Sequence, residues 1–255
     1  MKTNLFTLEN KTVLVTGASS GIGRQCAITC SRMGARGLLF GRNKTRLDET
    51  LHLMELRNNH RIFSIDLNEF EHIKGILKEI VSQSGKIDGL INCAGISTTL
   101  PFHAVSSQKM EHYFKTNVIS SMNLTNLAIR SANFSANGGS VVFISSVMGV
   151  AGENGKVLYS MTKGALIASV KSLAIELAKR KIRVNAILPG VVDTPMSKNA
   201  IYNRSEESLK KIERLHPLGL GKPVDVANAA LFLLSDASSW ITGTNMIVDG
   251  GYLAR

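Results

Sequence analysis

No apolar stretch of this chain approaches the roughly 18 residues that a membrane-spanning helix needs, so we expect no membrane partner. Only three cysteines are present, Cys26, Cys30 and Cys93, and no second pair completes a metal site. Because this odd count comes with no apolar signal-peptide core at the N-terminus, we expect reduced thiols and a cytoplasmic protein. Cys26 and Cys30 stand at helical spacing among apolar residues, which indicates small core residues.

Aromatic residues are also scarce, at 5% of the chain, and no helix-turn-helix, zinc-finger or aromatic-interleaved pattern concentrates the basic residues. The net charge of +11 therefore does not indicate nucleic acid as a partner, because the lysines and arginines are spread along the whole chain. A protein whose ligands carry phosphates is the simpler interpretation, since the summed positive field steers anions towards a site.

The order of apolar and amphipathic segments predicts one α/β domain over residues 1–255, without linker or repeat. Expected strands are short β-branched runs at 12–16, up to 40, and at 61–65, 88–92, 141–145, 183–188 and 245–248. Expected helices end near 33 and 57 and span 68–83, 111–132, 158–180 and 223–234. This alternation predicts a doubly wound, mostly parallel sheet of seven strands with helices on both faces. The polar segment 191–218 is expected to be a lid over substrate.

Tyr159 and Lys163 stand four positions apart in a helical pattern, so their side chains lie on one face, about one turn apart. An ammonium beside a phenol favours the phenolate and lowers the pKa of the phenol from about 10. Such a phenol can give a proton to a carbonyl oxygen, or remove one from an alcohol, near neutral pH. Ser146 can hydrogen-bond the same oxygen. Because such a pair is most often only a solvated helix face, the interpretation depends on a nucleotide site elsewhere in the chain.

Gly17, Gly21 and Gly23 directly follow the first expected strand and open a helix. Glycines there let the backbone approach a pyrophosphate, and the helix N-terminus offers unpaired N–H groups. The pattern predicts a dinucleotide site, the alternative being a tight turn chosen for packing. The second strand ends without the acidic residue typical of NAD sites, and Arg42 stands there instead. Because a guanidinium can bind a 2′-phosphate through two bonds, NADP(H) is predicted over NAD(H), which stays open.

Together these motifs resemble the short-chain dehydrogenase/reductase family, and the resemblance extends over essentially the whole chain. The matching residues are Thr16 to Gly23, Asp66, Leu67, Asn92 to Gly95, Asn117, Ser146, Tyr159, Lys163, Pro189, Gly190, Val192 and Thr194. The resemblance implies a single-domain Rossmann fold, a homotetramer, and an oxidoreductase that interconverts a carbonyl and a secondary alcohol.

The resemblance also implies the cofactor contacts. They would be Gly17, Ser19, Ser20, Gly21, Ile22, Gly23, Arg42, Asp66, Leu67, Asn92, Ala94, Gly95, Tyr159, Lys163, Pro189, Gly190, Val192 and Thr194. Asp66 would contact the adenine amino group, and Asn92 would line the adenosine ribose side. Cys93 departs from the family pattern, which has a second asparagine there, and would weaken one backbone hydrogen bond.

The catalytic set implied by the resemblance is Asn117, Ser146, Tyr159 and Lys163. Tyr159 would protonate the carbonyl oxygen as hydride arrives from the nicotinamide, while Ser146 holds that oxygen. Lys163 would hold the nicotinamide ribose, and Asn117 would hold a water that links Lys163 to solvent. Ser145 competes with Ser146, and the family's spacing to Tyr159 favours Ser146.

The members that the chain resembles include 3-oxoacyl-acyl-carrier-protein reductases and sugar-alcohol, steroid and small-ketone dehydrogenases. Lys179, Arg180 and Lys181 would suit an acidic acyl carrier protein as partner, although the helix dipole alone favours cations there. Lys156 and Leu158 argue against that substrate, because they replace the residues usual in those reductases. Expected pocket walls are Ile96, Ser97, Met148, Val150, Glu153, Val157, Met196, Ile201 and Tyr202. A non-catalytic NADPH-binding sensor stays open, because a fold alone does not give function.

Overall fold

The computed structural model describes residues 4–55, 59–198 and 206–254. In this part of the chain seven strands form one sheet in the order β3-β2-β1-β4-β5-β6-β7, with every pair parallel. The strands are β1 (Thr12–Thr16), β2 (Arg36–Gly41), β3 (Arg61–Ser64), β4 (Gly89–Asn92), β5 (Gly139–Ile144), β6 (Ile182–Pro189) and β7 (Asn245–Val248). The predicted seven-stranded parallel sheet is confirmed.

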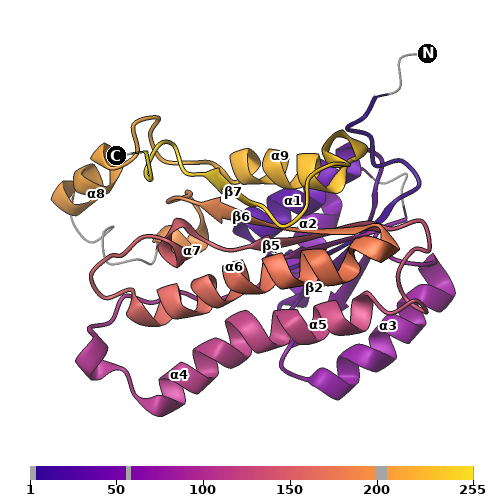
Figure 1. Ribbon diagram of the computed structural model, residues 1–255, viewed down its shortest axis with the longest axis horizontal. Coiled ribbons are helices and arrows are strands. Elements are labelled where there is room, and N and C mark those ends of the chain that lie inside the picture. The colour runs from indigo at the N-terminus through magenta and orange to yellow at the C-terminus, as the bar shows by residue number, and fades with distance from the viewer. Residues whose placement is uncertain (1–3, 56–58, 199–205, 255) are drawn as a thin grey trace.

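Helices cover both faces of the sheet (Figure 1). They are α1 (Gly21–Arg32), α2 (Lys44–His52), α3 (Phe70–Ser84), α4 (Ser107–Phe114), α5 (Ser120–Ala128), α6 (Val157–Leu177), α7 (Pro195–Lys198), α8 (Glu206–Arg214) and α9 (Pro223–Leu234). One core lies between the sheet and α3, α5 and α6, and a second lies between the opposite face and α1, α2 and α9. Among the described helices, none is long and apolar enough to cross a membrane.

Strand β1 shows how the sequence produces these two cores. Leu14 packs in the core beneath α3, α5 and α6, whereas Val13 and Val15 pack in the core beneath α1 and α9. Successive side chains of a strand point to opposite faces, and helices cover both faces here. All five residues of β1 are therefore buried.

The helix expected over 111–132 is divided in the structure. Helix α4 ends at Phe114, a π-helical turn spans Lys115–Ile119, and α5 ends at Ala128. A π turn holds one residue more than an α turn, and such turns are frequent at functional sites. Asn117 lies within this turn and is 1% exposed. The helix expected to end near residue 57 already ends at His52.

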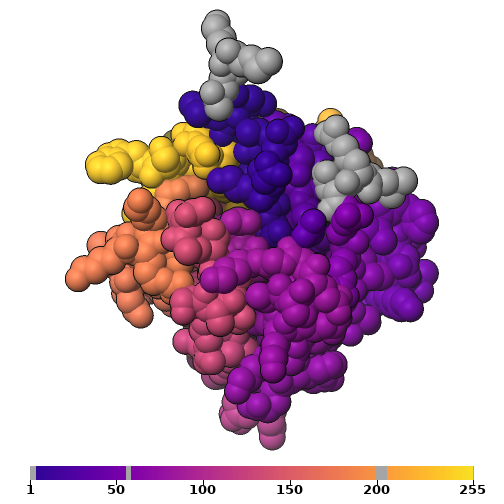
Figure 2. Space-filling model, turned by 90° about the vertical axis from the view of Figure 1, so that its right-hand side faces the viewer, coloured from indigo at the N-terminus to yellow at the C-terminus, as the bar shows by residue number. Residues whose placement is uncertain are grey.

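The strand order positions the site. The chain leaves β1 towards β2 on one side, and β4 pairs with the other side of β1, so the order reverses between β1 and β4. Ligands of such sheets bind beyond the carboxyl ends of the strands at this switch point. At the opposite end, seen in Figure 2, the N-terminal segment packs against the segment after α9. Ala237 N donates to Leu5 O at 3.1 Å there, and Lys11 pairs with Asp236 at 2.9 Å.

Candidate active site

The loop between β1 and α1 requires its glycines. Gly17 and Gly21 have left-handed backbones, with φ of 65° and 54°. A Cβ at Gly17 would lie 3.1 Å from the backbone of Ala94, and a Cβ at Gly23 would collide with the carbonyl oxygen of Gly17. Ser20 is the N-cap of α1, but its side chain makes no capping hydrogen bond. The first-turn N–H groups of α1 can therefore bind an anion in the adjoining cavity.

Two arginines line the end of the cavity beyond β2, where the adenosine of a dinucleotide is expected. Arg42 and Arg46 are both exposed, and neither forms an ion pair within the described residues. Asn43 is the N-cap of α2, and its Oδ1 accepts from Arg46 N at 2.9 Å. The sequence motifs point to Arg42 but not to Arg46. The signal for Arg46 is its place in the first turn of α2, four positions after Arg42.

Asp66 and Leu67 follow β3 and line the same end of the cavity. Asp66 Oδ1 accepts two hydrogen bonds from Asn68, from the backbone N and from Nδ2, both at 2.9 Å. Neither bond uses Asp66 Oδ2, which can accept from an amino group. The geometry therefore suits the adenine contact that the resemblance implies for Asp66.

The chain after β4 forms the floor of the cavity. Thr16 Oγ1 accepts from Cys93 N at 2.9 Å and from Ala94 N at 3.0 Å, which holds this segment against the end of β1. Asn92 turns away from the cavity, because it is 4% exposed and its Nδ2 donates to Thr125 Oγ1 at 2.9 Å. The side chain expected beside the ribose is thus used to fix the end of β4 to α5.

Cys93 lines the cavity at the position where the family pattern has asparagine. Burial raises the pKa of its thiol to about 11, while Lys163 and the backbone N–H of Gly23 act in the opposite direction. The thiol is therefore neutral at pH 7 and is a weak acceptor. The backbone N–H of Gly23 contacts the sulfur of Cys93 in this structure.

Tyr159 and Lys163 lie one turn apart on α6, and both line the cavity. Lys163 Nζ lies 5.6 Å from the centroid of the Tyr159 ring and donates to Ile144 O at 2.8 Å. Burial lowers the pKa of Lys163 to about 8, against a raising contribution from Cys93. The bond to Ile144 uses one of the three N–H donors of the ammonium, so two can serve the hydroxyls of a ligand.

The two candidate serines have different neighbours. Ser145 Oγ donates to the backbone oxygen of Lys163 at 2.9 Å, so its hydroxyl hydrogen is used inside the protein. Ser146 Oγ instead accepts from Met148 N at 3.1 Å, which leaves the hydroxyl hydrogen able to donate into the cavity. This geometry favours Ser146 as the group that holds a substrate oxygen.

Asn117 does not line the cavity, because its side chain is hydrogen-bonded to Ile96 after β4 and to Thr162 on α6. Its Oδ1 accepts from Ile96 N at 2.8 Å, and its Nδ2 donates to Ile96 O at 2.9 Å and to Thr162 Oγ1 at 3.1 Å. These bonds hold the segment after β4 against α6. Both Nδ2 donors are used, so the water implied by the resemblance would donate to Asn117, either to the second lone pair of Oδ1 or to the backbone carbonyl.

The end of β6 and the segment after it border the cavity near Tyr159, and the lining residues there include Pro189, Gly190, Val192 and Thr194. His216 is 2% exposed and holds this segment in place by hydrogen bonds. Its Nε2 accepts from Val191 N at 3.1 Å, and its Nδ1 donates to Ile212 O at 2.8 Å, which fixes a neutral ring in one tautomer. The sequence motifs do not point to His216, because its partners are distant in the chain.

The predicted substrate residues fall into three groups. Ile96, Ser97, Met148, Glu153 and Met196 line the cavity. Val150 and Val157 are not among the lining residues, and they are 56% and 41% exposed. Tyr202 and Ile201 lie outside the described residues. Lys156 lines the cavity although no motif pointed to it as a wall residue.

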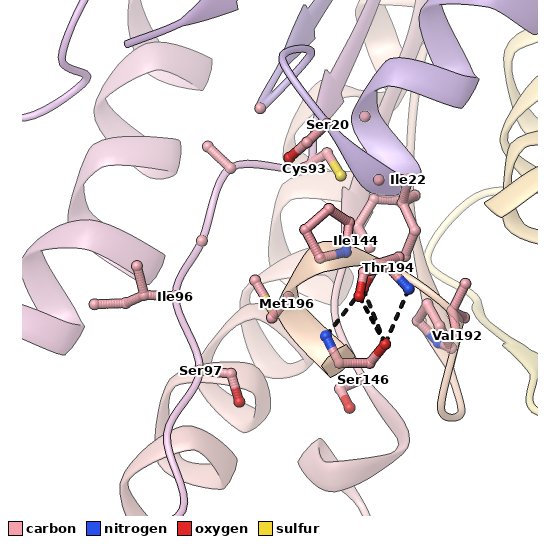
Figure 3. A pocket seen from close by; sticks show the side chains of 18 of the residues that line it. Ser20, Ile22, Cys93, Ile96, Ser97, Ile144, Ser146, Val192, Thr194 and Met196 are labelled. Atoms are coloured by element: carbon pink, nitrogen blue, oxygen red, sulfur yellow. Dashed lines mark hydrogen bonds between the residues drawn. The ribbon is translucent and has the colours of Figure 1, made fainter. Parts of the chain in front are cut away.

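One cavity of about 810 Å³ joins these parts, from Arg42 to Met196. In Figure 3, Ser20 and Ile22 of the dinucleotide loop lie towards the top of the view, Ser97 and Ser146 lie towards the bottom, and Thr194 and Met196 lie between them. This volume lies within the range of about 300–1,000 Å³ typical of ligand sites. No cluster of three or more metal-ligating side chains occurs among the residues that the structure describes.

Comparison with known proteins gives consistent matches along the chain. A family model described as enoyl-(acyl carrier protein) reductase matches residues 17–253. The 3-oxoacyl-[acyl-carrier-protein] reductase of Thermotoga maritima is 34% identical over 246 residues, which cover 96% of this chain and 98% of that protein. The cyclopentanol dehydrogenase of Comamonas sp. is 32% identical over 252 residues, covering 97% and 99%.

Among solved structures, a provisionally named NAD(P)-dependent gluconate 5-dehydrogenase of Beutenbergia cavernae, with NADP bound at low occupancy, superposes with a TM-score of 0.90. It is 30% identical, and the match covers 99% of this chain and 100% of that chain. These matches include both the glycine loop and the helix that carries Tyr159. The chain therefore belongs to the short-chain dehydrogenase/reductase family, whose members use nicotinamide cofactors.

Proposed function

We propose that the protein interconverts a carbonyl and a secondary alcohol, with NADP(H) as its preferred cofactor and Tyr159 as the acid and base. The observation that carries this proposal is the single cavity that joins the uncapped N-terminus of α1 to Tyr159, Lys163 and Ser146. A site for the hydride donor and a site for the proton donor thus open into one space.

The residues present fit a nicotinamide dinucleotide. The glycine loop places no Cβ between the backbone and a phosphate, the N–H groups of α1 suit the pyrophosphate, and Lys163 has donors for the ribose hydroxyls. When bound, the cofactor supplies or accepts the hydride. Pro189, Gly190, Val192 and Thr194 would border its nicotinamide end.

The side chains around Tyr159 provide the rest of the chemistry. Tyr159 gives its proton to the substrate oxygen as negative charge develops there, and removes that proton in the reverse direction. Ser146 donates to the same oxygen, and this bond strengthens with the developing charge. The ammonium of Lys163, 5.6 Å from the ring centroid, favours the phenolate of Tyr159. Ser145 fixes the backbone of Lys163.

Preference for NADP(H) is supported by the charges at the adenosine end. Arg42 and Arg46 line it, and β2 ends at Gly41 without an acidic residue. A guanidinium binds a phosphate through two parallel bonds, whereas an acidic residue there would repel it. The sensor alternative would use the same cofactor contacts but would need no proton donor beside the nicotinamide.

The relatives favour two kinds of substrate, a 3-oxoacyl thioester and a small cyclic or sugar-derived alcohol. The basic cluster Lys179, Arg180 and Lys181 was expected to serve an acyl carrier protein beside the cavity. It follows the far end of α6, about 30 Å along the axis from Tyr159 at 1.5 Å per residue. The cluster therefore does not border the cavity of its own chain, which weakens the case for a carrier-bound substrate.

The proposal is tested by NADPH oxidation with an acetoacetyl thioester, run beside cyclopentanone and a panel of ketones and keto-sugars. Tyr159→Phe should lower turnover about 10²- to 10⁴-fold while NADPH binding stays unchanged, because only the proton donor is lost. An NADH arm measures the cofactor preference. Wild-type turnover in Tyr159→Phe would contradict the assigned role, and cofactor binding without turnover of any compound would favour the sensor alternative.

A homotetramer in a reducing cytoplasm completes the proposal. Three large apolar side chains are exposed: Ile175 on α6 at 80%, Trp240 before β7 at 97%, and Ile247 on the edge strand β7 at 52%. Copies of the chain could cover them. Cys26, Cys30 and Cys93 are free thiols. Light scattering after size-exclusion chromatography tests the assembly, and Trp240→Ser should lower its mass if this surface is the interface.

A further inference from the structure

Lys156 is a buried cation at the substrate end of the cavity. Its side chain lines the cavity, and the residue is only 7% exposed. Its Nζ makes one long hydrogen bond, 3.4 Å to Thr98 O, although an ammonium has three donors. No carboxylate of the described residues lies within ion-pair distance of it. The ammonium thus has donors available within the cavity.

The helix terminus and burial both disfavour a positive charge at this position. Lys156 is the N-cap of α6, a helix of 21 residues, and the N-terminus of a helix is the positive end of its dipole. Burial also lowers the pKa of Lys156, and only Glu153 acts in the opposite direction. An anion bound beside Lys156 would be attracted by the ammonium and by the helix terminus together.

The position of Lys156 is fixed by the backbone around it. Lys156 N donates to Glu153 O at 3.1 Å, and Leu100 N donates to Gly155 O at 2.9 Å. Gly155 has φ of 74°, and a Cβ on it would approach Thr99 Cγ2 to 2.9 Å. The turn that carries Lys156 is therefore fastened to the same segment that accepts its long hydrogen bond. These contacts fix where the ammonium of Lys156 lies in the cavity wall.

We propose that Lys156 binds a carboxylate of the substrate, so that the preferred substrates are hydroxy acids and oxo acids. This inference rests on the proposed function and names its substrate class. Lys156 stands three positions before Tyr159, and side chains at this spacing have Cβ atoms about 5–6 Å apart. The carboxylate would therefore lie a few bonds from the carbon that exchanges hydride. One ammonium matches a monoanion, while Glu153 in the same wall disfavours a dianion such as a phosphate ester.

The test uses matched pairs of substrates that differ in charge: 3-hydroxybutyrate with its methyl ester, and D-gluconate with sorbitol. Wild-type enzyme should prefer each acid over its neutral partner in kcat/KM. Lys156→Met removes the charge and keeps the length of the side chain. It should raise KM for the acids about 10- to 100-fold, the effect of losing a hydrogen bond to a charged group, with kcat and the neutral partners little changed.

Two further variants separate local from general effects. Glu153→Gln should lower KM for the acids, because it removes a negative charge from the same wall. Lys78→Met makes the control substitution on α3, where the side chain is exposed and does not line the cavity. This control variant should leave kcat/KM unchanged for both members of each substrate pair. If Lys156→Met does not fold, Lys156→Gln supplies the same comparison.

No preference for acids in the wild type, or an equal loss for acids and neutral partners in Lys156→Met, would overturn the inference and leave the oxidoreductase proposal standing. Turnover of no compound at all would instead count against the proposed function. In that case calorimetric titration of the NADPH-loaded protein with D-gluconate and 3-hydroxybutyrate decides the role of Lys156. Binding lost in Lys156→Met supports it, and equal or absent binding in both proteins overturns it.

Discussion

Removing the guanidinium groups at the adenosine end is expected to weaken NADPH far more than NADH. Arg42 and Arg46 line this part of the cavity and form no ion pair within the described residues, so both are available to a 2′-phosphate. A hydrogen bond to a charged group contributes about 1.5–3 kcal/mol. Because both side chains are exposed, solvent screening reduces this to about 1–1.5 kcal/mol for each arginine. That corresponds to about tenfold in KM for each single variant and about a hundredfold for the pair.

The assay is steady-state kcat/KM with NADPH and with NADH for wild type, Arg42→Ala, Arg46→Ala and the double variant. The NADPH effect should shrink at high ionic strength, since exposed charges are screened, and NADH should change less than twofold throughout. Arg32→Ala is the matched control, because Arg32 is exposed at the far end of α1. An equal loss of kcat/KM with both cofactors would refute the reasoning. An unchanged kcat/KM for NADPH in the double variant would refute it too.

Three further outcomes follow from the structure. In the cofactor-free protein the folded pKa of Lys163, about 8, is below its unfolded value, so the unfolded state binds more protons above pH 8. The free energy of unfolding of the wild type should therefore rise from about pH 8 to 10.5, by up to about 3 kcal/mol relative to Lys163→Met. Urea titrations at several pH values measure this, and the same pH dependence in both proteins would contradict it. Burial lowers the pKa of His60, whose Nδ1 accepts from Gly37 N at 2.8 Å, so stability should fall as pH falls below about 6.5, and less so in His60→Asn. Gly23→Ala should abolish NADPH binding in fluorescence titrations, because its Cβ would collide with Gly17 O, and retained affinity would show that the loop adapts.

Much of the site could be predicted from the sequence because its parts are local. Gly17, Gly21 and Gly23 occupy one strand-to-helix turn, and Tyr159 and Lys163 share one helix face, so spacing alone implies their geometry. The sheet could be predicted for a similar reason. Parallel strands buried on both faces leave short continuous apolar runs, and the alternation with helices implies their order.

Other features depend on contacts between distant segments, and spacing carries no signal for them. Asn92 turns away from the cavity because Thr125 on α5 accepts its amide hydrogen. His216 reaches the site only because α8 brings it beside Val191. The division of the helix expected over 111–132 has the same origin, since Asn117 bonds both Ile96 and α6 from a π turn. Amphipathic periodicity detects a helix but not the extra residue in one of its turns.

The electrostatics of α6 connect the two proposals. Lys156 and Lys163 are both at least nine-tenths buried, they lie on either side of Tyr159, and burial lowers the pKa of each. A buried ammonium costs folding free energy, and the single hydrogen bond that each makes, to Ile144 O and to Thr98 O, compensates only part of that cost before ligands bind. The cofactor would bring ribose hydroxyls to Lys163, and a substrate carboxylate would bring the missing negative charge to Lys156. A net charge of +11 attracts both of these anionic ligands. If this is correct, NADPH and a hydroxy acid together should stabilise the fold more than either alone, and Lys156→Met should lose only the contribution of the acid.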